Sequence, residues 1–370
     1  MAPTFAAALR DVRAKSQAAR IAAAERLGQA EAAELGQAVS ALCAVSDDAQ
    51  AIVRAAGIRA LGELGTQHRG ALAAEDQVIG ALSKRLADSS SQVREVATIA
   101  LGQVGGALCH RALEQALDST HPEVRFQAIA GYVETSDSAE PRKVIAFLRD
   151  QDAEVRSQAA RALSALATTA PGAKTAVISS LKSALEDSHA RTRAEAALAL
   201  AKLGDASGRD ALGVALDDTT LRGEALDAIA ALSLKSYSDV IARLARNVFT
   251  SPFDRTAMAR TLARLQDARG LELLRAALAG FRAAPRVLAV QAIGELGLVE
   301  LAPEVIKLVD RARGVDALTL IEALGALAGA GSQAAREGLE RLAGARGRAA
   351  ELATTELNRR VGAQSQPPSP

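Results

Sequence analysis

Arginine recurs along this chain at nearly regular intervals, and an aspartate often precedes it. In most copies, small or apolar residues follow the arginine about three, seven and ten positions later. The arginines in this frame are Arg20, Arg54, Arg94, Arg125, Arg156, Arg193, Arg222, Arg255 and Arg286. Aspartates stand about six residues before several of them, at Asp48, Asp88, Asp118, Asp150 and Asp187. Because a guanidinium group binds a carboxylate through two charge-assisted hydrogen bonds, the pattern indicates either structural ion pairs or a row of cations for an anionic partner.

Side chains suited to catalysis or metal binding are sparse. The four histidines are His68, His110, His121 and His189, and even the two that share a position in the frame lie two repeats apart. There is no G-x-S-x-G elbow and no C-x-x-C pair. The segment from Pro171 to Thr175 lacks the first glycine of a phosphate-binding loop. We therefore expect no catalytic residue, no cofactor and no metal site; these observations favour a chain that is not an enzyme but leave the question open.

One region departs from the arginine–aspartate pattern. The position expected to hold an aspartate before Arg255 is Phe249, and Phe253 and Phe281 lie nearby, so that three of the six phenylalanines of the chain fall in two adjacent turns. Aromatic residues and arginine are enriched at protein interfaces. Two interpretations follow: the phenylalanines fill thin packing between repeats, or they form a docking patch.

The same region is rich in arginine. From Arg243 to Arg286 there are nine arginines but only three acidic residues, and Arg260 and Arg264 are spaced to share one helix face. The candidate partner-binding residues are therefore Phe249, Phe253, Arg260, Arg264 and Phe281. Nucleic-acid binding through this basic stretch is an alternative, although a net charge of +1 gives no general argument for it.

The elements that position these residues are predicted to be helices. The chain has 370 residues, of which 49% are hydrophobic but only 2% aromatic, and it contains no tryptophan. A core of Ala, Leu, Val and Ile without aromatic bulk favours closely packed helices. From Asp88 to Gly105, a turn precedes an apolar stripe at Val93, Ala97, Leu101 and Val104. A second amphipathic segment lies between successive arginines, so a unit of two helices recurs every 29–40 residues, which is typical of a helical solenoid.

These repeats resemble the HEAT repeat family, particularly its short bacterial form related to the phycobilisome-lyase-type repeats. The resemblance rests on segments such as Asp88…Val93-Arg94…Ala97…Leu101-Gly102 and Asp150…Val155-Arg156…Ala159. It implies an all-α, right-handed α-solenoid of about ten or eleven helical hairpins over residues 1–362. The last residues, 363–370, lack packing residues and contain two consecutive prolines, so we expect a disordered tail there. It also implies that the arginines and aspartates link successive turns. We expect a structural ladder made by Arg54, Arg94, Arg125, Arg156, Arg193, Asp88, Asp118 and Asp187.

The function that this architecture favours is a non-catalytic scaffold or adaptor for a protein partner of unknown identity. The resemblance also allows a lyase-type or chaperone-like subunit that binds a chromophore or its acceptor protein. No apolar run approaches the ~20 residues of a membrane span, and Cys43 and Cys109 are too far apart in the repeat pattern for a disulfide. We therefore expect a cytoplasmic protein with free thiols, and leave the oligomeric state open.

Overall fold

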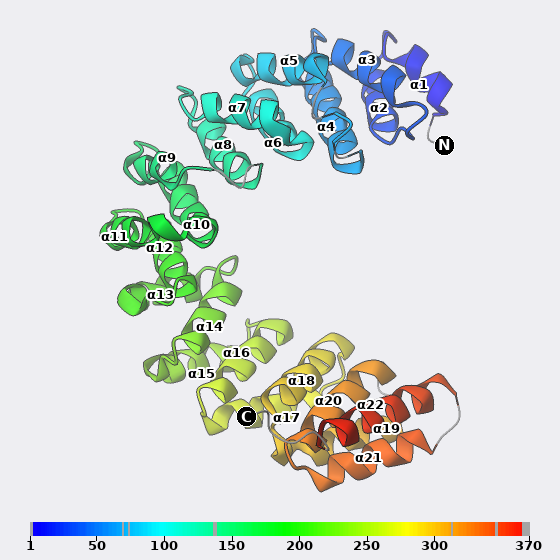
Figure 1. Cartoon of the computed structure of the whole chain (residues 1–370), viewed down its shortest axis with the longest axis vertical. Coiled ribbons are helices and arrows are strands. Elements are labelled where there is room, and N and C mark those ends of the chain that lie inside the picture. The colour runs from blue at the N-terminus through cyan, green and yellow to red at the C-terminus, as the bar shows by residue number, and fades with distance from the viewer. Residues whose placement is uncertain are drawn as a thin grey trace. The chain divides into compact units, whose positions relative to one another are not determined.

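The structure is a computed structural model that describes residues 3–68, 70–72, 75–135, 139–311, 314–344 and 347–364. Within these residues the chain folds into 22 α-helices, with short 3-10 turns and no β-strand (Figure 1). It divides into two compact units, Met1–Val214 and Ala215–Pro370. The last helix ends at Gln364, so residues 365–370 of the predicted tail lie outside the described residues.

The first unit consists of six helical hairpins in succession. They are α1 (Phe5–Asp11) with α2 (Gln17–Leu27), α3 (Leu35–Val45) with α4 (Ala51–Gln67), α5 (Asp76–Lys84) with α6 (Ser91–Val104), α7 (Gly106–Ala116) with α8 (Pro122–Glu134), α9 (Pro141–Ala146) with α10 (Ala153–Thr169), and α11 (Lys174–Ala184) with α12 (Ala190–Lys202). Helix α13 (Leu212–Asp217) contains the division between the units.

The second unit repeats the same arrangement. Helix α14 (Arg222–Ala231) comes first. The four hairpins that follow are α15 (Ser238–Arg246) with α16 (Pro252–Arg264), α17 (Ala268–Ala279) with α18 (Ala283–Leu296), α19 (Ala302–Arg311) with α20 (Ala317–Gly329), and α21 (Gln333–Ala343) with α22 (Arg348–Gln364). The prediction of an all-α solenoid built from ten or eleven hairpins is confirmed.

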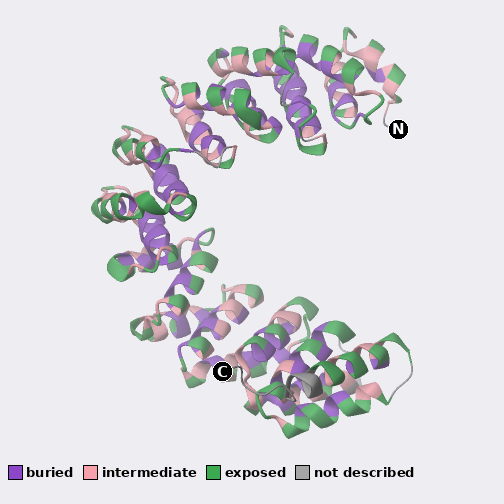
Figure 2. Cartoon of the chain, in the orientation of Figure 1, coloured by how far each residue is buried: buried purple, intermediate pink, exposed green. Residues whose placement is uncertain are grey.

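The even-numbered helices carry most of the core. Within the first unit α4 packs against α6, α6 against α8, and α10 against α12, and Figure 2 shows buried residues concentrated on helices such as α4, α10 and α12. Small residues permit this close packing. A Cβ atom added at Gly65 of α4 would lie 2.7 Å from the Cα atom of Val104 in α6. Helices that approach so closely leave no space between them for large aromatic side chains, which accounts for the low aromatic content of the chain.

Helix α6 shows how the sequence determines one repeat. Val93, Ala97, Leu101 and Val104 are all buried, as the periodicity predicts. The helix ends at Gly105, whose φ of +69° favours glycine. The turn before the helix is closed by Asp88, whose Oδ1 accepts a hydrogen bond from the Ser90 N–H at 3.0 Å. The aspartate therefore fixes the turn, whereas the side chain of Ser90 makes no capping bond.

Three further sequence predictions concern membranes, thiols and metals. None of the described helices combines the length and the apolar character that a membrane span requires. Cys43 and Cys109 are buried free cysteines, and burial raises the pKa of both thiols to about 11. The described part of the chain contains no group of three or more His, Cys, Asp or Glu side chains placed to hold a metal ion.

Candidate functional site

The marker arginines lie near the starts of even-numbered helices, and those that bind a carboxylate of the next repeat connect two successive turns. Arg54 is the clearest example. Its Nε and Nη2 atoms donate to the two carboxylate oxygens of Asp88 in the next turn, at 2.9 and 2.6 Å. Its Nη1 atom donates to the carbonyl oxygen of Asp48 in its own turn, at 2.9 Å. One guanidinium group therefore holds one turn to the next.

The same geometry recurs through the first unit, and we call this row of bonds the ladder. The bidentate pairs are Arg20 with Asp48, Arg54 with Asp88, Arg125 with Asp150, and Arg156 with Asp187. Arg193 shares the local part of the pattern, because its Nη1 atom donates to the carbonyl oxygen of Asp187 at 2.7 Å. Each of these aspartates lies in the turn before a helix. It stands six residues before the marker arginine of that helix, and it pairs with the arginine of the preceding repeat.

The prediction for Asp118 is wrong, because that residue stands one position too early. It lies seven residues before Arg125, and Ser119 occupies the ladder position instead. The carbonyl oxygen of Ser119 accepts from Arg125 Nη1 at 2.8 Å, and its hydroxyl accepts from the His121 N–H. Serine offers no carboxylate, so Arg94 pairs with Glu123 of the next helix, where its Nε lies 2.9 Å from Oε1.

The ladder carboxylates are held in their charged form. Burial opposes the ionisation of Asp88, but hydrogen bonds from Arg54, the Ser90 N–H and Arg85 outweigh it and lower its pKa to about 2. The same balance lowers the pKa values of Asp150 and Asp187, with Arg125 and Arg156 as the respective donors. The ladder is therefore an electrostatic framework of the fold rather than a set of exposed cations.

The ladder is first interrupted before Arg222, where its position holds Leu216, and in the second unit it weakens and then stops. Its position before Arg255 is Phe249, so Arg222 reaches Asp254 instead, with Nη1 at 3.4 Å from Oδ2. The next ladder position, six residues before Arg286, is Gly280. Consequently Arg255 has no carboxylate in the next turn. Among the described residues it donates to the carbonyl oxygen of Ala245 at the end of α15 and to those of Asn247 and Thr250 in the turn before its own helix, at 2.8–3.2 Å.

The three phenylalanines in this region are exposed. Phe249 is 92% exposed, Phe281 89% and Phe253 58%, and Val248 beside them is also exposed. The interpretation that they fill packing gaps in the core is therefore wrong. A large apolar side chain left in water at this position stabilises the fold little, so its presence needs another explanation.

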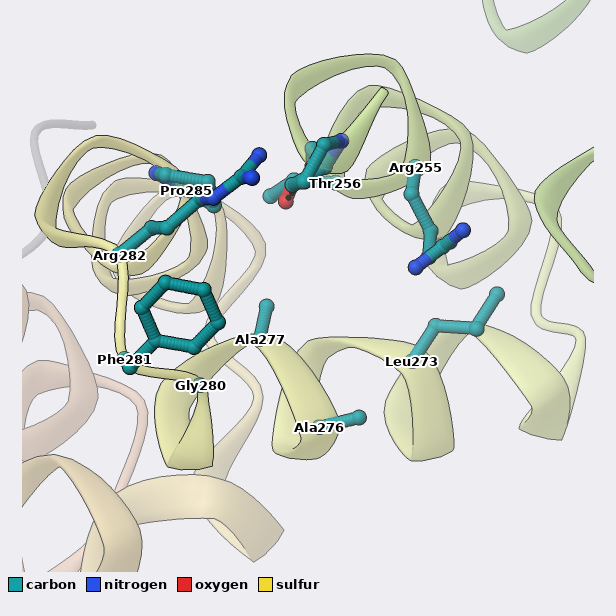
Figure 3. A pocket seen from close by; sticks show the side chains of 10 residues that line it. Arg255, Thr256, Leu273, Ala276, Ala277, Gly280, Phe281, Arg282 and Pro285 are labelled. Carbon is teal, nitrogen blue, oxygen red and sulfur yellow. Dashed lines mark hydrogen bonds between the residues drawn. The ribbon is translucent and has the colours of Figure 1, made fainter. Parts of the chain in front are cut away.

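A hollow of about 290 Å³ lies where the ladder stops, between the start of α16, the helix α17 and the start of α18 (Figure 3). Its walls are mostly apolar and consist of Pro252, Arg255, Thr256, Leu273, Ala276, Ala277, Gly280, Phe281, Arg282 and Pro285. Figure 3 shows Arg255 at the end near Leu273, with Phe281 and Arg282 at the other end. We call this hollow, together with the exposed Phe249, Phe253 and Phe281 of the two adjoining segments, the gap site.

The arginine pair predicted to accompany the phenylalanines does not join the gap site. Arg260 and Arg264 lie seven and eleven residues after Phe253 in α16, which places them about 10 and 16 Å farther along the helix. Arg260 Nη2 lies 2.6 Å from Asp227 Oδ1 in α14. Arg264 pairs with Glu295 in α18. Both arginines thus tie neighbouring helices together.

Other arginines in the basic stretch are neutralised in the same way. Arg269 pairs with Asp239 and Asp267, and Arg275 with Glu304. Several of these carboxylates lie outside the stretch from Arg243 to Arg286, so the local charge excess in the sequence overstates the charge presented by the fold. Arg282 lies over the ring of Phe281, 5.5 Å from its centroid.

Comparisons with known proteins agree on the repeat. A family model for HEAT repeats matches residues 79–163 and 141–220, and a model for a HEAT repeat associated with sister chromatid cohesion matches residues 59–97. No curated protein matches the chain. Neither family match reaches the gap site, which lies beyond residue 245.

Two solved structures show the same architecture. YibA of Escherichia coli aligns with a TM-score of 0.50 and 18% identity over 67% of this chain and 92% of its own. Kap95p, from a structure with RanGDP, aligns with a TM-score of 0.55 and 11% identity over 99% of this chain. The alignment spans 60% of the Kap95p chain, and at these identities the likeness concerns the fold alone. The sequence matches thus identify HEAT repeats over residues 59–220, and the helical hairpins continue on both sides of this range.

Proposed function

We propose that the chain is a non-catalytic scaffold and that a protein partner docks at the gap site. A HEAT-repeat array is suited to protein interaction, but the fold alone does not say where a partner binds. One observation carries the proposal: half of the phenylalanines of the chain are exposed around the place where the ladder stops. Exposed aromatic residues beside an apolar hollow are typical of the centre of a protein interface.

Nucleic-acid binding has less support at this site. Backbone recognition of DNA or RNA requires cations that are free to contact phosphates. Arg260, Arg264, Arg269 and Arg275 instead bind carboxylates of this chain. The walls of the hollow are mostly apolar, which suits a side chain better than a phosphate.

A chromophore-binding role also has less support. The hollow measures about 290 Å³, at the lower limit of the ~300–1,000 Å³ that is usual for pockets enclosing a ligand of drug size. Among the three exposed phenylalanines only Phe281 lines it, so the rings do not converge on one cavity. A cytoplasmic location remains part of the proposal.

Replacing Phe249, Phe253 and Phe281 together by serine is expected to abolish partner capture and leave the fold intact. Exposed residues usually contribute within ~0.5 kcal/mol to stability, whereas an interface anchor typically contributes ~2 kcal/mol or more to binding. The measurement is quantitative affinity capture, with thermal melting of each variant. The matched control replaces Ile52, Ile99 and Leu318 by serine, because these apolar residues are exposed elsewhere. Equal capture by the two triple variants would contradict the proposal.

A further inference from the structure

We propose that the partner supplies the carboxylate that the ladder lacks. An acidic side chain of the partner pairs with Arg255, and a large apolar side chain next to it enters the hollow. The ligand class is therefore a peptide segment with Asp or Glu beside a large apolar residue. This inference rests on the proposed function and specifies the chemistry of its partner.

The register of the repeat shows where the missing carboxylate belongs. Arg94 donates to the carbonyl oxygen of Asp88 at 2.7 Å, six residues earlier. Arg286 donates in the same way to the carbonyl oxygen of Gly280, also six residues earlier. Gly280 is thus the structural equivalent of Asp88. Because glycine has no side chain, the place of the carboxylate is empty, and Gly280 forms part of the wall of the hollow.

Arg255 retains a donor for that carboxylate. Its Nε and Nη2 atoms are used by carbonyl oxygens, while its Nη1 atom has no hydrogen-bond partner among the described residues. Arg222 has the same arrangement, with Nε and Nη2 on the carbonyl oxygens of Leu216 and Asp217. In Arg222 the remaining Nη1 atom binds Asp254. The equivalent atom of Arg255 is therefore the one that would bind a carboxylate brought by a partner.

The charge of the hollow agrees with an acidic ligand. Two arginines, Arg255 and Arg282, belong to its wall, and none of the described carboxylates does. Carbonyl oxygens accept hydrogen bonds from Nε and Nη2 of Arg255, but no carboxylate of the described residues pairs with its positive charge. A carboxylate would neutralise that charge through a hydrogen bond stronger than one between neutral groups.

The shape of the hollow indicates what accompanies the carboxylate. Leu273, Ala276 and Ala277 of α17 form one apolar wall, and Pro252 and Pro285 lie at the starts of the two neighbouring even-numbered helices. A volume of about 290 Å³ is small for a whole ligand of drug size, but it suits one or two apolar side chains. A phosphate group could not use these apolar walls, because it makes no favourable contact with apolar side chains. The hollow therefore favours a peptide over a nucleic acid.

The first test is a peptide array probed with the full chain. Each peptide of the array carries one acidic residue, Asp or Glu, next to one of Leu, Ile, Met, Phe, Tyr or Trp, within an otherwise Gly-Ser sequence. A matched peptide replaces the acidic residue by its amide, Asn or Gln. We expect acidic copies to bind at least about tenfold more tightly than their amide counterparts in a follow-up by fluorescence anisotropy. Equal binding by acid and amide copies, or an array without binding, would overturn the inference. Tight binding of a short single-stranded oligonucleotide in place of the peptides would do so as well.

The second test rebuilds the ladder within the chain. Gly280 has a φ of −57°, which suits any residue. A Cβ atom there would lie 3.2 Å from the carbonyl oxygen of Ala277, so a small shift accommodates it. In Gly280→Asp the new carboxylate joins the wall of the hollow, where it lowers the positive charge set by Arg255 and Arg282 and competes with the peptide. We expect peptide affinity to fall about tenfold or more, and the melting temperature to exceed that of Gly280→Asn, the uncharged control of equal size.

The two tests separate the inference from the proposed function. If Gly280→Asp binds peptide and captures partner as the wild type does, while the triple phenylalanine variant loses capture, the carboxylate inference fails and the docking site remains. If both variants capture partner normally, the proposed function fails too. Identical peptide affinity and melting temperature for Gly280→Asp and Gly280→Asn would also overturn the inference, because charge at position 280 would then have no effect.

Discussion

Replacing Asp88 by alanine is expected to lower the free energy of unfolding by about 3–5 kcal/mol, because it removes one partner from a buried ion pair. The side chain of Asp88 is only 2% exposed and binds both Arg54 and Arg85. Its loss leaves the guanidinium group of Arg54 buried without a counter-ion, and it also opens the turn that the Asp88 carboxylate closes on the Ser90 N–H. Urea unfolding followed by circular dichroism measures the effect.

The matched control for this variant is Asp118→Ala. Asp118 also lies in a turn before a marker arginine, but Ser119 occupies the ladder position there. Surface substitutions usually change stability by no more than ~0.5 kcal/mol, and we expect that range for Asp118→Ala. Equal losses for the two alanine variants would show that the ladder does not stabilise the repeat.

Acid is expected to destabilise the fold as the pH falls from about 5 to 2. Asp88 has a pKa of about 2 in the folded chain, below the ordinary value of 3.8 for an aspartate. A lowered folded-state pKa contributes stability above the unfolded value, and this stability is lost as the pH falls through the folded value. For Asp88 the contribution is about 2 kcal/mol. Glu123, Asp150 and Asp187 add to it with the same sign, because their pKa values are also lowered.

The measurement is the free energy of unfolding as a function of pH for the wild type and for Asp88→Ala. The variant should lose less stability than the wild type between pH 5 and 2, since it no longer has this carboxylate to protonate. Parallel curves for the two proteins would contradict the assignment of the lowered pKa to the ladder.

Much of the architecture could be predicted because the same sequence pattern recurs in each repeat. The stripe at Val93, Ala97, Leu101 and Val104 predicts a buried helix face, and those residues are buried. Periodicity works here because packing against the next repeat imposes one pattern on every copy. Asp118 shows the limit of periodicity as a predictor. A shift of one residue moves a side chain out of the ladder, and a spacing known only approximately cannot detect a shift of that size.

The gap site could be predicted only in part. The loss of an aspartate at Phe249 draws attention to the correct turns, but Gly280 carries the more specific signal, since it marks the position where no carboxylate follows Arg255. The hollow could not be predicted, because Pro252, Leu273 and Pro285 belong to three different helices. The arginine pair was misplaced because the carboxylates that bind it, Asp227 and Glu295, belong to other repeats.

Site-specific photocrosslinking tests the central claim most directly. A benzophenone-bearing amino acid replaces Phe281 in the gap site or, as the control, Ile52, an exposed apolar residue in a repeat where the ladder is intact. Irradiation in the host cell should give a discrete crosslinked protein from position 281 and none from position 52, and Gly280→Asp should reduce the yield at 281. Crosslinks of equal yield from both positions, or none from position 281, would contradict the claim that the partner docks where the ladder stops.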